Sequence, residues 1–354
     1  MMIVFLIIVI ALALLLQKFL FGKDLELIEA DHRPDVPVAE PGEAFHVEIT
    51  LKNKSRRVIP FLRLRMNFGD GVVPSGYDAP EESSDVCHVE FTTWLRARQS
   101  LKRSVPVSVA ARGRYVLREF YLYTGDFLGL HEQSKTCGRF REVVVAPKEI
   151  AMGRLQDMFG GFMGEISVNR FIMEDPVLTL GYREYTGREP MKMISWAQSA
   201  RTGELMVKKY DYTLEPTVSV VLNVETQVPE PEDLLETCFS LARTVCAMLE
   251  RRGVKYSFAS NAILGGAPAD PGAMGEGLGQ RHFTGILEHL GRATYAHNLS
   301  MQRLLEKESQ RGMAAGCILI TPGGEGENVR AVNRLREASG GNLLVLRASE
   351  VAAW

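Results

Sequence analysis

The period with which apolar residues recur changes part-way along this chain, and that change constrains the fold most. Between Asp24 and Pro147, apolar and polar residues alternate, as they do along Phe45–Leu51 and Leu62–Met66. Alternation places every second side chain on the same face of a strand, and turn residues such as Pro41-Gly42 separate the runs. Short strands of this kind predict an antiparallel β-sandwich-like domain over residues 24–147.

The last part of the chain alternates between strand and helix patterns. Thr217–Leu222 is a continuous β-branched run, which is typical of a strand buried on both faces. Pro229–Arg252 has an apolar stripe with helical spacing, acidic residues at its start, and Arg251-Arg252-Gly253 at its end. Further strands are expected at Val254–Ser260, Gly316–Thr321 and Asn342–Arg347, with helices between them. This order predicts an α/β domain with a mostly parallel sheet over residues 216–354.

Composition excludes several classes of function. The chain has 354 residues, enough for two domains, and a net charge of −2 gives no general attraction to nucleic acid. Its five cysteines form no Cys-x-x-Cys pair, which fits a reducing compartment and gives no metal-ligand pattern. The histidines form no His-Glu-x-x-His motif, and no Gly-x-Ser-x-Gly occurs. We therefore expect no enzymatic activity, no catalytic residue and no cofactor.

The N-terminus is apolar without interruption from Met1 to Leu16, and Phe19–Phe21 continue the run. With Lys18 snorkelling, residues 1–22 are expected to form a transmembrane anchor. A cleaved signal peptide is the alternative, but no basic segment precedes the run and no Ala-x-Ala site follows it. Lys18 and Lys23 favour an orientation that leaves the rest of the chain in the cytoplasm. The expected localisation is therefore the cell membrane, with a single pass.

Residues 148–180 carry Gly153, Gly160-Gly161 and Gly164 among methionines and phenylalanines. They match no phosphate-binding loop, so we expect a flexible connection. Two upstream segments, Arg112–Tyr115 and Asp126–Leu130, have the composition of turns at strand ends.

A charged and aromatic motif at residues 181–215 joins the two domains in sequence. Its candidate partner-binding residues are Arg183, Tyr185, Arg188, Lys192, Trp196, Ser199, Arg201 and Lys208. Arginine suits bidentate contact with carboxylates or phosphates, and Trp196 could form one wall of a site. In the alternative, the arginines pair with acidic residues of the same chain while Trp196 packs between the two domains; these acidic residues are Glu184, Glu189, Glu204 and Asp211.

One long motif resembles that of bacterial proteins of the domain of unknown function family fifty-eight. It has the order Arg183-x-Tyr185, Gly187, the basic Lys192, Ile194-x-Trp196 and Ser199-Ala200-Arg201-x-Gly203-x-Leu205-x-Val207. That resemblance implies N-terminal membrane segments, a β-rich region, and a C-terminal domain similar to von Willebrand factor A domains. It also implies a MoxR-type AAA+ ATPase as partner, with other membrane or envelope proteins. The expected fold class is thus α+β multidomain: a transmembrane helix, an antiparallel β-sandwich, and an α/β von Willebrand A-like (Rossmann-like) domain.

The chain departs from this family where a metal would bind. A von Willebrand A-like domain holds Mg²⁺ through Asp-x-Ser-x-Ser after its first strand, whereas this chain has Asn223, Glu225 and Thr226 there. Loss of the aspartate removes the charge that holds the ion, so no metal is expected in this degenerate slot.

These observations predict a membrane-anchored, non-enzymatic interaction or assembly factor that works with a MoxR-type ATPase. Two alternatives are an enzyme or binding protein for a phosphate-bearing small molecule in a motif-lined cleft, and an extracellular adhesion-type module.

Overall fold

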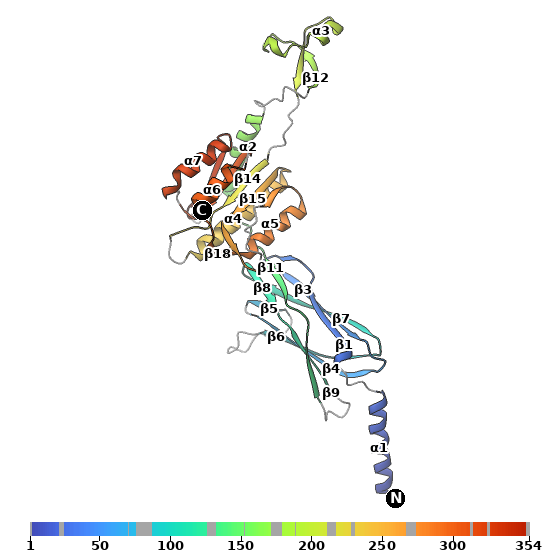
Figure 1. Ribbon diagram of the computed structural model, residues 1–354. Helices are drawn as coiled ribbons and strands as arrows, with labels where there is room; N and C mark the ends of the chain where they lie inside the picture. The colour runs from blue at the N-terminus through green and yellow to red at the C-terminus, as the bar shows by residue number, and fades with distance from the viewer. Residues whose placement is uncertain are drawn as a thin grey trace. The chain divides into compact units, whose positions relative to one another are not determined.

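A computed structural model describes residues 2–20, 25–69, 71–75, 87–125, 132–151, 153–170, 179–187, 189–210, 217–227, 231–266, 274–311, 314–323 and 326–351 (Figure 1). The chain divides into two compact units. The first holds residues 1–148 and 287–293, and the second holds residues 149–286 and 294–354. Asp126–Leu130 and Arg188 lie outside the described residues.

The first unit is built from three mostly antiparallel sheets that enclose one core. One sheet has the order β1 (Ile28–Pro34), β3 (Ala44–Asn53), β7 (Ser100–Val109) and β5 (Val72–Pro74). A second has the order β10 (Glu132–Cys137), β9 (Phe120–Gly125), β4 (Ile59–Phe68) and β6 (Cys87–Leu95). A third joins β2 (Val38–Ala39), β11 (Arg141–Val145) and β8 (Gly113–Leu117), with β2 parallel to β11.

Alternation explains why these strands enclose a core. Phe45, Val47, Ile49 and Leu51 on β3 are all buried, as are the alternating apolar residues of β4. The period-two pattern predicted these buried positions, and the structure confirms them. Burying one face of each sheet removes apolar surface from water, which is the main favourable term in forming such a unit.

A short segment from much later in the sequence, Leu287–Ala293, also belongs to the first unit. It includes the end of α5 (Gln280–Arg292). Arg112 Nη1 donates to the carbonyl oxygens of Leu290 and Ala293 at 2.8 and 2.5 Å. A guanidinium at a helix C-terminus satisfies carbonyls that have no intrahelical partner. The Arg112–Tyr115 turn therefore anchors a distant helix end as well as entering β8.

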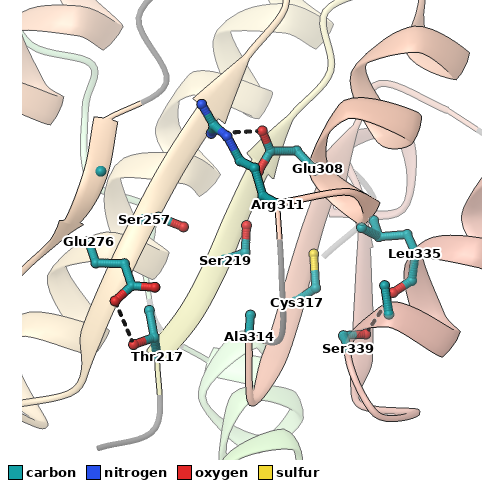
Figure 2. Close-up of a pocket in the computed structure, with 12 residues that line it drawn as sticks. Thr217, Ser219, Ser257, Glu276, Glu308, Arg311, Ala314, Cys317, Leu335 and Ser339 are labelled. Carbon is teal, nitrogen blue, oxygen red and sulfur yellow. Dashed lines mark hydrogen bonds and ion pairs between the residues drawn. The ribbon is translucent and has the colours of Figure 1, made fainter.

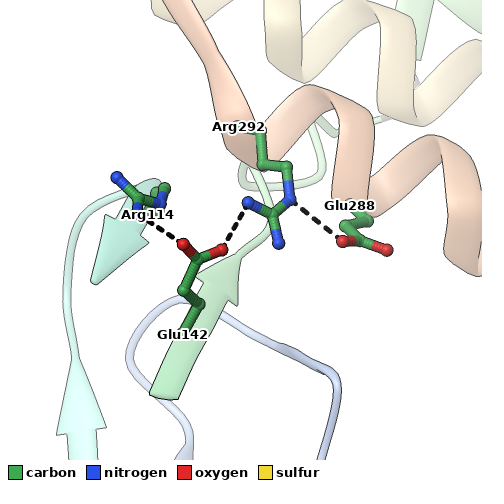
Figure 3. A network of polar contacts seen from close by, with 4 residues as sticks. All are labelled: Arg114, Glu142, Glu288 and Arg292. Atoms are coloured by element: carbon green, nitrogen blue, oxygen red, sulfur yellow. Dashed lines mark hydrogen bonds and ion pairs between the residues drawn. The ribbon is translucent and has the colours of Figure 1, made fainter. Parts of the chain in front are cut away.

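Figure 3 shows the ion-pair network that holds the same segment. Arg292 Nη1 lies 2.6 Å from Glu142 and its Nε lies 2.9 Å from Glu288. Arg114 pairs with the other oxygen of Glu142. Arginine suits this role because its planar fork can donate to two carboxylates at once.

The second unit contains a five-stranded sheet with helices packed against it. The order is β17 (Met274–Gly277), β15 (Lys255–Ser260), β14 (Thr217–Leu222), β19 (Gly316–Thr321) and β20 (Leu343–Arg347). The last four strands are mutually parallel, and β17 is antiparallel to β15. The helices are α2 (Gly153–Arg170), α4 (Glu232–Arg251), α6 (Met301–Ser309), α7 (Val329–Ala338) and α8 (Ala348–Val351).

Residues 153–170 differ from the flexible connection that the sequence predicts, because they form helix α2. Leu155, Phe159, Phe162 and Ile166 are buried, and their spacing follows the helical period. The Cζ of Phe162 and the Cδ1 of Ile166 reach Gly316 at the start of β19. The glycines obscured this stripe because each one lowers helix propensity.

The expected transmembrane anchor at residues 1–22 is wrong. Helix α1 (Met2–Leu20) covers this region, yet within the described residues no helix is both long and apolar enough to cross a membrane. Gln17 and Lys18 end the uninterrupted apolar run, and at 1.5 Å per residue that run covers about 24 Å of a roughly 30 Å hydrocarbon core. The predicted localisation as a single-pass membrane protein depended on this anchor and is therefore withdrawn as well.

The fold class as a whole is also corrected, to a β-rich chain of two units. A Gly-, Pro- and Ala-rich stretch predicts a loop across Gly265–Gly279, and one or two helices are expected between Phe283 and Glu308. Helices α5 and α6 confirm the expected helices, whereas β16 (Ala262–Leu264), β17 and β18 (Ala293–His297) lie where no strand was expected, with β16 paired to β18. Strands this short carry too few residues for a periodic signal. The alternation of strand and helix that supported a von Willebrand A-like, Rossmann-like domain is therefore interrupted by an antiparallel strand, β17, and by the separate pair of β16 and β18.

Candidate functional site

The described part of the signature motif folds as a two-stranded ladder with a helical insertion. β12 (Thr179–Glu184) pairs antiparallel with β13 (Met206–Tyr210), so that Arg183 lies opposite Val207 and Tyr182 opposite Lys208. Between them lie the 3-10 turn η2 (Met191–Met193) and helix α3 (Trp196–Thr202). Pro190 precedes η2, and Gly203 ends α3 with a φ of 81°, a conformation that glycine adopts without strain.

Ser199 connects the helix to the strand. Its hydroxyl donates to the Ser195 carbonyl at 2.9 Å and accepts from the Met206 amide at 2.8 Å. Beside it, Ile194 and Val207 form a β-bridge, and both side chains are buried. Because these residues maintain the shape of the motif, the structure gives Ser199 a positioning role.

Arg183 is occupied by its own chain. Its guanidinium pairs with Glu189, which also accepts from the amide and hydroxyl of Thr186. These hydrogen bonds, with that of Arg183 the strongest, lower the pKa of Glu189 to about 2. Gly187 turns the chain between these residues with a φ of 86°. For Arg183, the self-paired alternative describes the geometry better than a donor aimed at a ligand.

Several other side chains of the motif face solvent. Trp196 is 62% exposed and Met191 is 68% exposed, so the indole is not packed internally. Lys192 and Arg201 are exposed too, and neither forms an ion pair with any residue the structure describes. Tyr185 and Lys208 are half-buried. Met191 and Leu205 (45% exposed) are not among the candidate partner-binding residues predicted from the sequence, although an apolar side chain within a charged segment could have indicated them.

The carboxyl ends of the parallel strands hold a closed network of amides. Asn261 Nδ2 donates to Asn223 Oδ1 at 2.8 Å, and Asn223 Nδ2 donates to Thr321 Oγ1 at 3.2 Å. Asn261 Oδ1 accepts from the Val224 amide at 2.8 Å. Glu225 Oε2 accepts from the Met301 amide at the first turn of α6, where a carboxylate is favourable.

This network corresponds to the degenerate metal slot. Both the amide nitrogen and the amide oxygen of Asn223 form hydrogen bonds within the chain, and the carboxylate of Glu225 accepts a hydrogen bond at the start of α6. Among the described residues, no group of three or more His, Cys, Asp or Glu side chains is placed to hold a metal ion. The Asn223 amide is neutral and its buried polar atoms are hydrogen-bonded within the chain, so the slot holds no charge that calls for a metal ion.

Comparison with known proteins gives little further guidance. No family model matches the chain, and no curated protein matches it. Among solved structures, a CARDB domain of a Pyrococcus furiosus protein in complex with di-metal ions is 14% identical, with a TM-score of 0.22, and the match covers 33% of this chain and 91% of that one. A cohesin module from a Clostridium perfringens family 33 glycoside hydrolase is 9% identical, with a TM-score of 0.24, over 34% of this chain and 96% of that one.

A human PapD-like domain is similarly distant, at 17% identity and a TM-score of 0.21, over 34% of this chain and 83% of that one. Scores this low support no conclusion about function. The slot where a von Willebrand A-like domain has Asp-x-Ser-x-Ser carries the Asn223 network instead. The von Willebrand A-like assignment is therefore not retained.

Proposed function

We propose that this protein is a non-enzymatic interaction or assembly factor whose contact surface is the exposed part of the signature motif. Exposure of the Trp196 indole carries this proposal. Tryptophan, tyrosine, methionine and arginine are enriched in the centres of protein interfaces, and a few such residues supply most of the binding energy. Trp196, Met191 and Arg201 are of these types and are exposed.

The partner we propose is a MoxR-type AAA+ ATPase, on the strength of the family resemblance of the motif. Lys192 and Arg201 would contact carboxylates on that partner, because both are exposed and neither is neutralised by a described residue. Arg183 is excluded from this role by its pairing with Glu189.

The alternative of a phosphate-bearing ligand in a motif-lined cleft has weaker support. It needs Arg183 and Lys192 to converge with Arg201 on one anion, and Arg183 is already paired. The pocket found in the described structure is lined by residues outside the motif.

The test is binding of the full chain to a purified MoxR-type ATPase, measured by biolayer interferometry. Trp196→Ala and Arg201→Glu should each weaken binding by about tenfold or more, as for interface residues that contribute at least 1–2 kcal/mol. Trp94→Ala and Arg303→Glu are matched controls, because both positions are exposed and outside the motif. Equal affinity of all four variants and the unchanged chain, or no binding of the unchanged chain, would refute the proposal.

A further inference from the structure

One face of the five-stranded sheet changes from apolar to polar towards the start of its strands. In the middle of that face, Val221 lies opposite Ala259 and Leu319, and these residues pack under α6 and α7. Two residues earlier on each strand, Ser219 lies opposite Ser257 and Cys317. Parallel pairing in register therefore places two hydroxyls and a thiol in a row across three strands, where a closed core would have apolar side chains.

This polar row is the floor of a pocket of about 340 Å³, shown in Figure 2. Glu308 and Arg311, from the end of α6 and the turn after it, form one wall. Glu276 of β17 lies at one side of the row, and Leu335 and Ser339 lie at the other side, next to α7. The volume is at the small end of the range of about 300–1,000 Å³ that is typical of ligand pockets.

The charged groups in the lining have an acidic excess. Glu308 has a side chain only 4% exposed and pairs with Arg311 at 2.9 Å. Burial raises the pKa of Glu308, and Arg311 and Ser219 oppose that effect. Glu276 Oε2 accepts from the Thr217 hydroxyl at 3.3 Å. Two carboxylates against one guanidinium leave a formal lining charge of −1, from Glu276 and Glu308 minus Arg311.

The same surroundings make the thiol inert. Burial, with Glu308 nearby, raises the pKa of Cys317 far above neutral, so the thiolate that would act as a nucleophile does not form. The row therefore presents a neutral thiol and two hydroxyls to the pocket.

We propose that this pocket binds a small primary ammonium compound, with the ammonium group held by Glu276 and the hydroxyls of Ser257 and Ser219. An ammonium ion has three N–H donors and a single positive charge. The carboxylate and the two hydroxyls supply three acceptors, and one positive charge neutralises the excess of the lining. Leu335 and Ala338 offer a small apolar surface for the carbon chain of such a ligand. The site shares no residue with the signature motif, so it is independent of the proposed function.

The test uses butylamine hydrochloride as the probe in calorimetric titration of the full chain. We expect saturable binding with one site per chain, and no binding of tetramethylammonium, which has the charge but no N–H donor. Glu276→Gln should weaken butylamine binding by about tenfold or more. Glu276 is exposed, so the Glu276→Gln variant is expected to fold. Glu306→Gln, on the same helix as Glu308 but outside the lining, is the control and should bind normally.

A second variant, Ser257→Ala, removes the hydroxyl without adding bulk to the pocket, and should also weaken binding several-fold. The proposal is overturned if butylamine gives no saturable heat, if Glu276→Gln binds it as well as the unchanged chain, or if butyrate binds in its place.

Discussion

Glu142 and Arg292 are 150 positions apart in the sequence, yet Oε2 of one and Nη1 of the other lie 2.6 Å apart. Arg292 is 16% exposed and also pairs with Glu288, while Glu142 also pairs with Arg114 (Figure 3). The Glu142 carboxylate and the Arg292 guanidinium are thus each held by a second ion pair as well as by their long-range contact. A pair fixed in this way loses less side-chain entropy than an isolated surface pair.

The first prediction follows from that contact. Arg292→Ala and Glu142→Gln should each lower stability by about 1–3 kcal/mol, and the double variant should show a coupling energy of about 1 kcal/mol. Urea denaturation of the unchanged chain, the two single variants and the double variant measures the coupling energy. The exposed pair of Lys54 and Glu29 is the control, and its coupling should be close to zero. A coupling energy for Glu142 and Arg292 no larger than that of the control pair would contradict the prediction.

Two helical glycines should respond in opposite ways to alanine. At Gly291, in the last turn of α5, an added Cβ would meet the Cγ1 of Val144 and lie 2.7 Å from the Val145 carbonyl oxygen. Gly291→Ala should therefore destabilise the chain by about 3 kcal/mol. At Gly161, on the exposed side of α2, no heavy atom lies within 4 Å of the added Cβ. There, Gly161→Ala should stabilise by up to about 1 kcal/mol. Thermal unfolding of both variants measures the change in stability. A stability change of the same sign in both variants would contradict the prediction.

The sequence predicted the first unit better than the second because its signal was regular. Alternation along β3 and β4 identified buried side chains correctly, since a strand with one buried face has no other periodicity. Helix α2 was missed because glycines lie between the residues of its apolar stripe, and β16, β17 and β18 were missed because they are short. No local pattern shows that Arg112 would reach Leu290, or that Ser219, Ser257 and Cys317 would share a row, because those relations depend on strand order and register.

Within the motif, the sequence located the segment and could not assign tasks to its residues. Arg183 and Arg201 have the same chemistry, and only the structure separates the one paired with Glu189 from the one that is exposed. Ser199 was a candidate for partner binding, but its hydroxyl accepts a hydrogen bond from the Met206 amide.

His289 should make the chain sensitive to acid. It is buried at 6% exposure, and burial lowers its pKa from 6.5 to about 4. As the pH falls from about 6.5 to 4, the unfolded chain takes up a proton that the folded chain does not, so stability decreases by about 3 kcal/mol over that range. His289→Leu should flatten this part of the pH profile, and His297→Gln, at an exposed position, should not. The midpoint of urea denaturation at several pH values measures the effect. Equal slopes for the unchanged chain and His289→Leu would exclude it.

Asn223→Asp tests whether the amide network excludes a metal ion. The new carboxylate would lie about where Nδ2 now donates to the Glu225 carbonyl at 3.3 Å, so an attractive contact becomes repulsive in a buried position. We expect a loss of about 2–4 kcal/mol, measured by urea denaturation. Asn298→Asp, at an exposed position, should change stability by less than about 0.5 kcal/mol. Millimolar Mg²⁺ should not restore the stability of Asn223→Asp, because a single aspartate beside Asn261 and Thr321 supplies too little negative charge to bind the ion. Recovery of stability that rises with Mg²⁺ concentration would show instead that this edge of the sheet admits a metal once its charge returns.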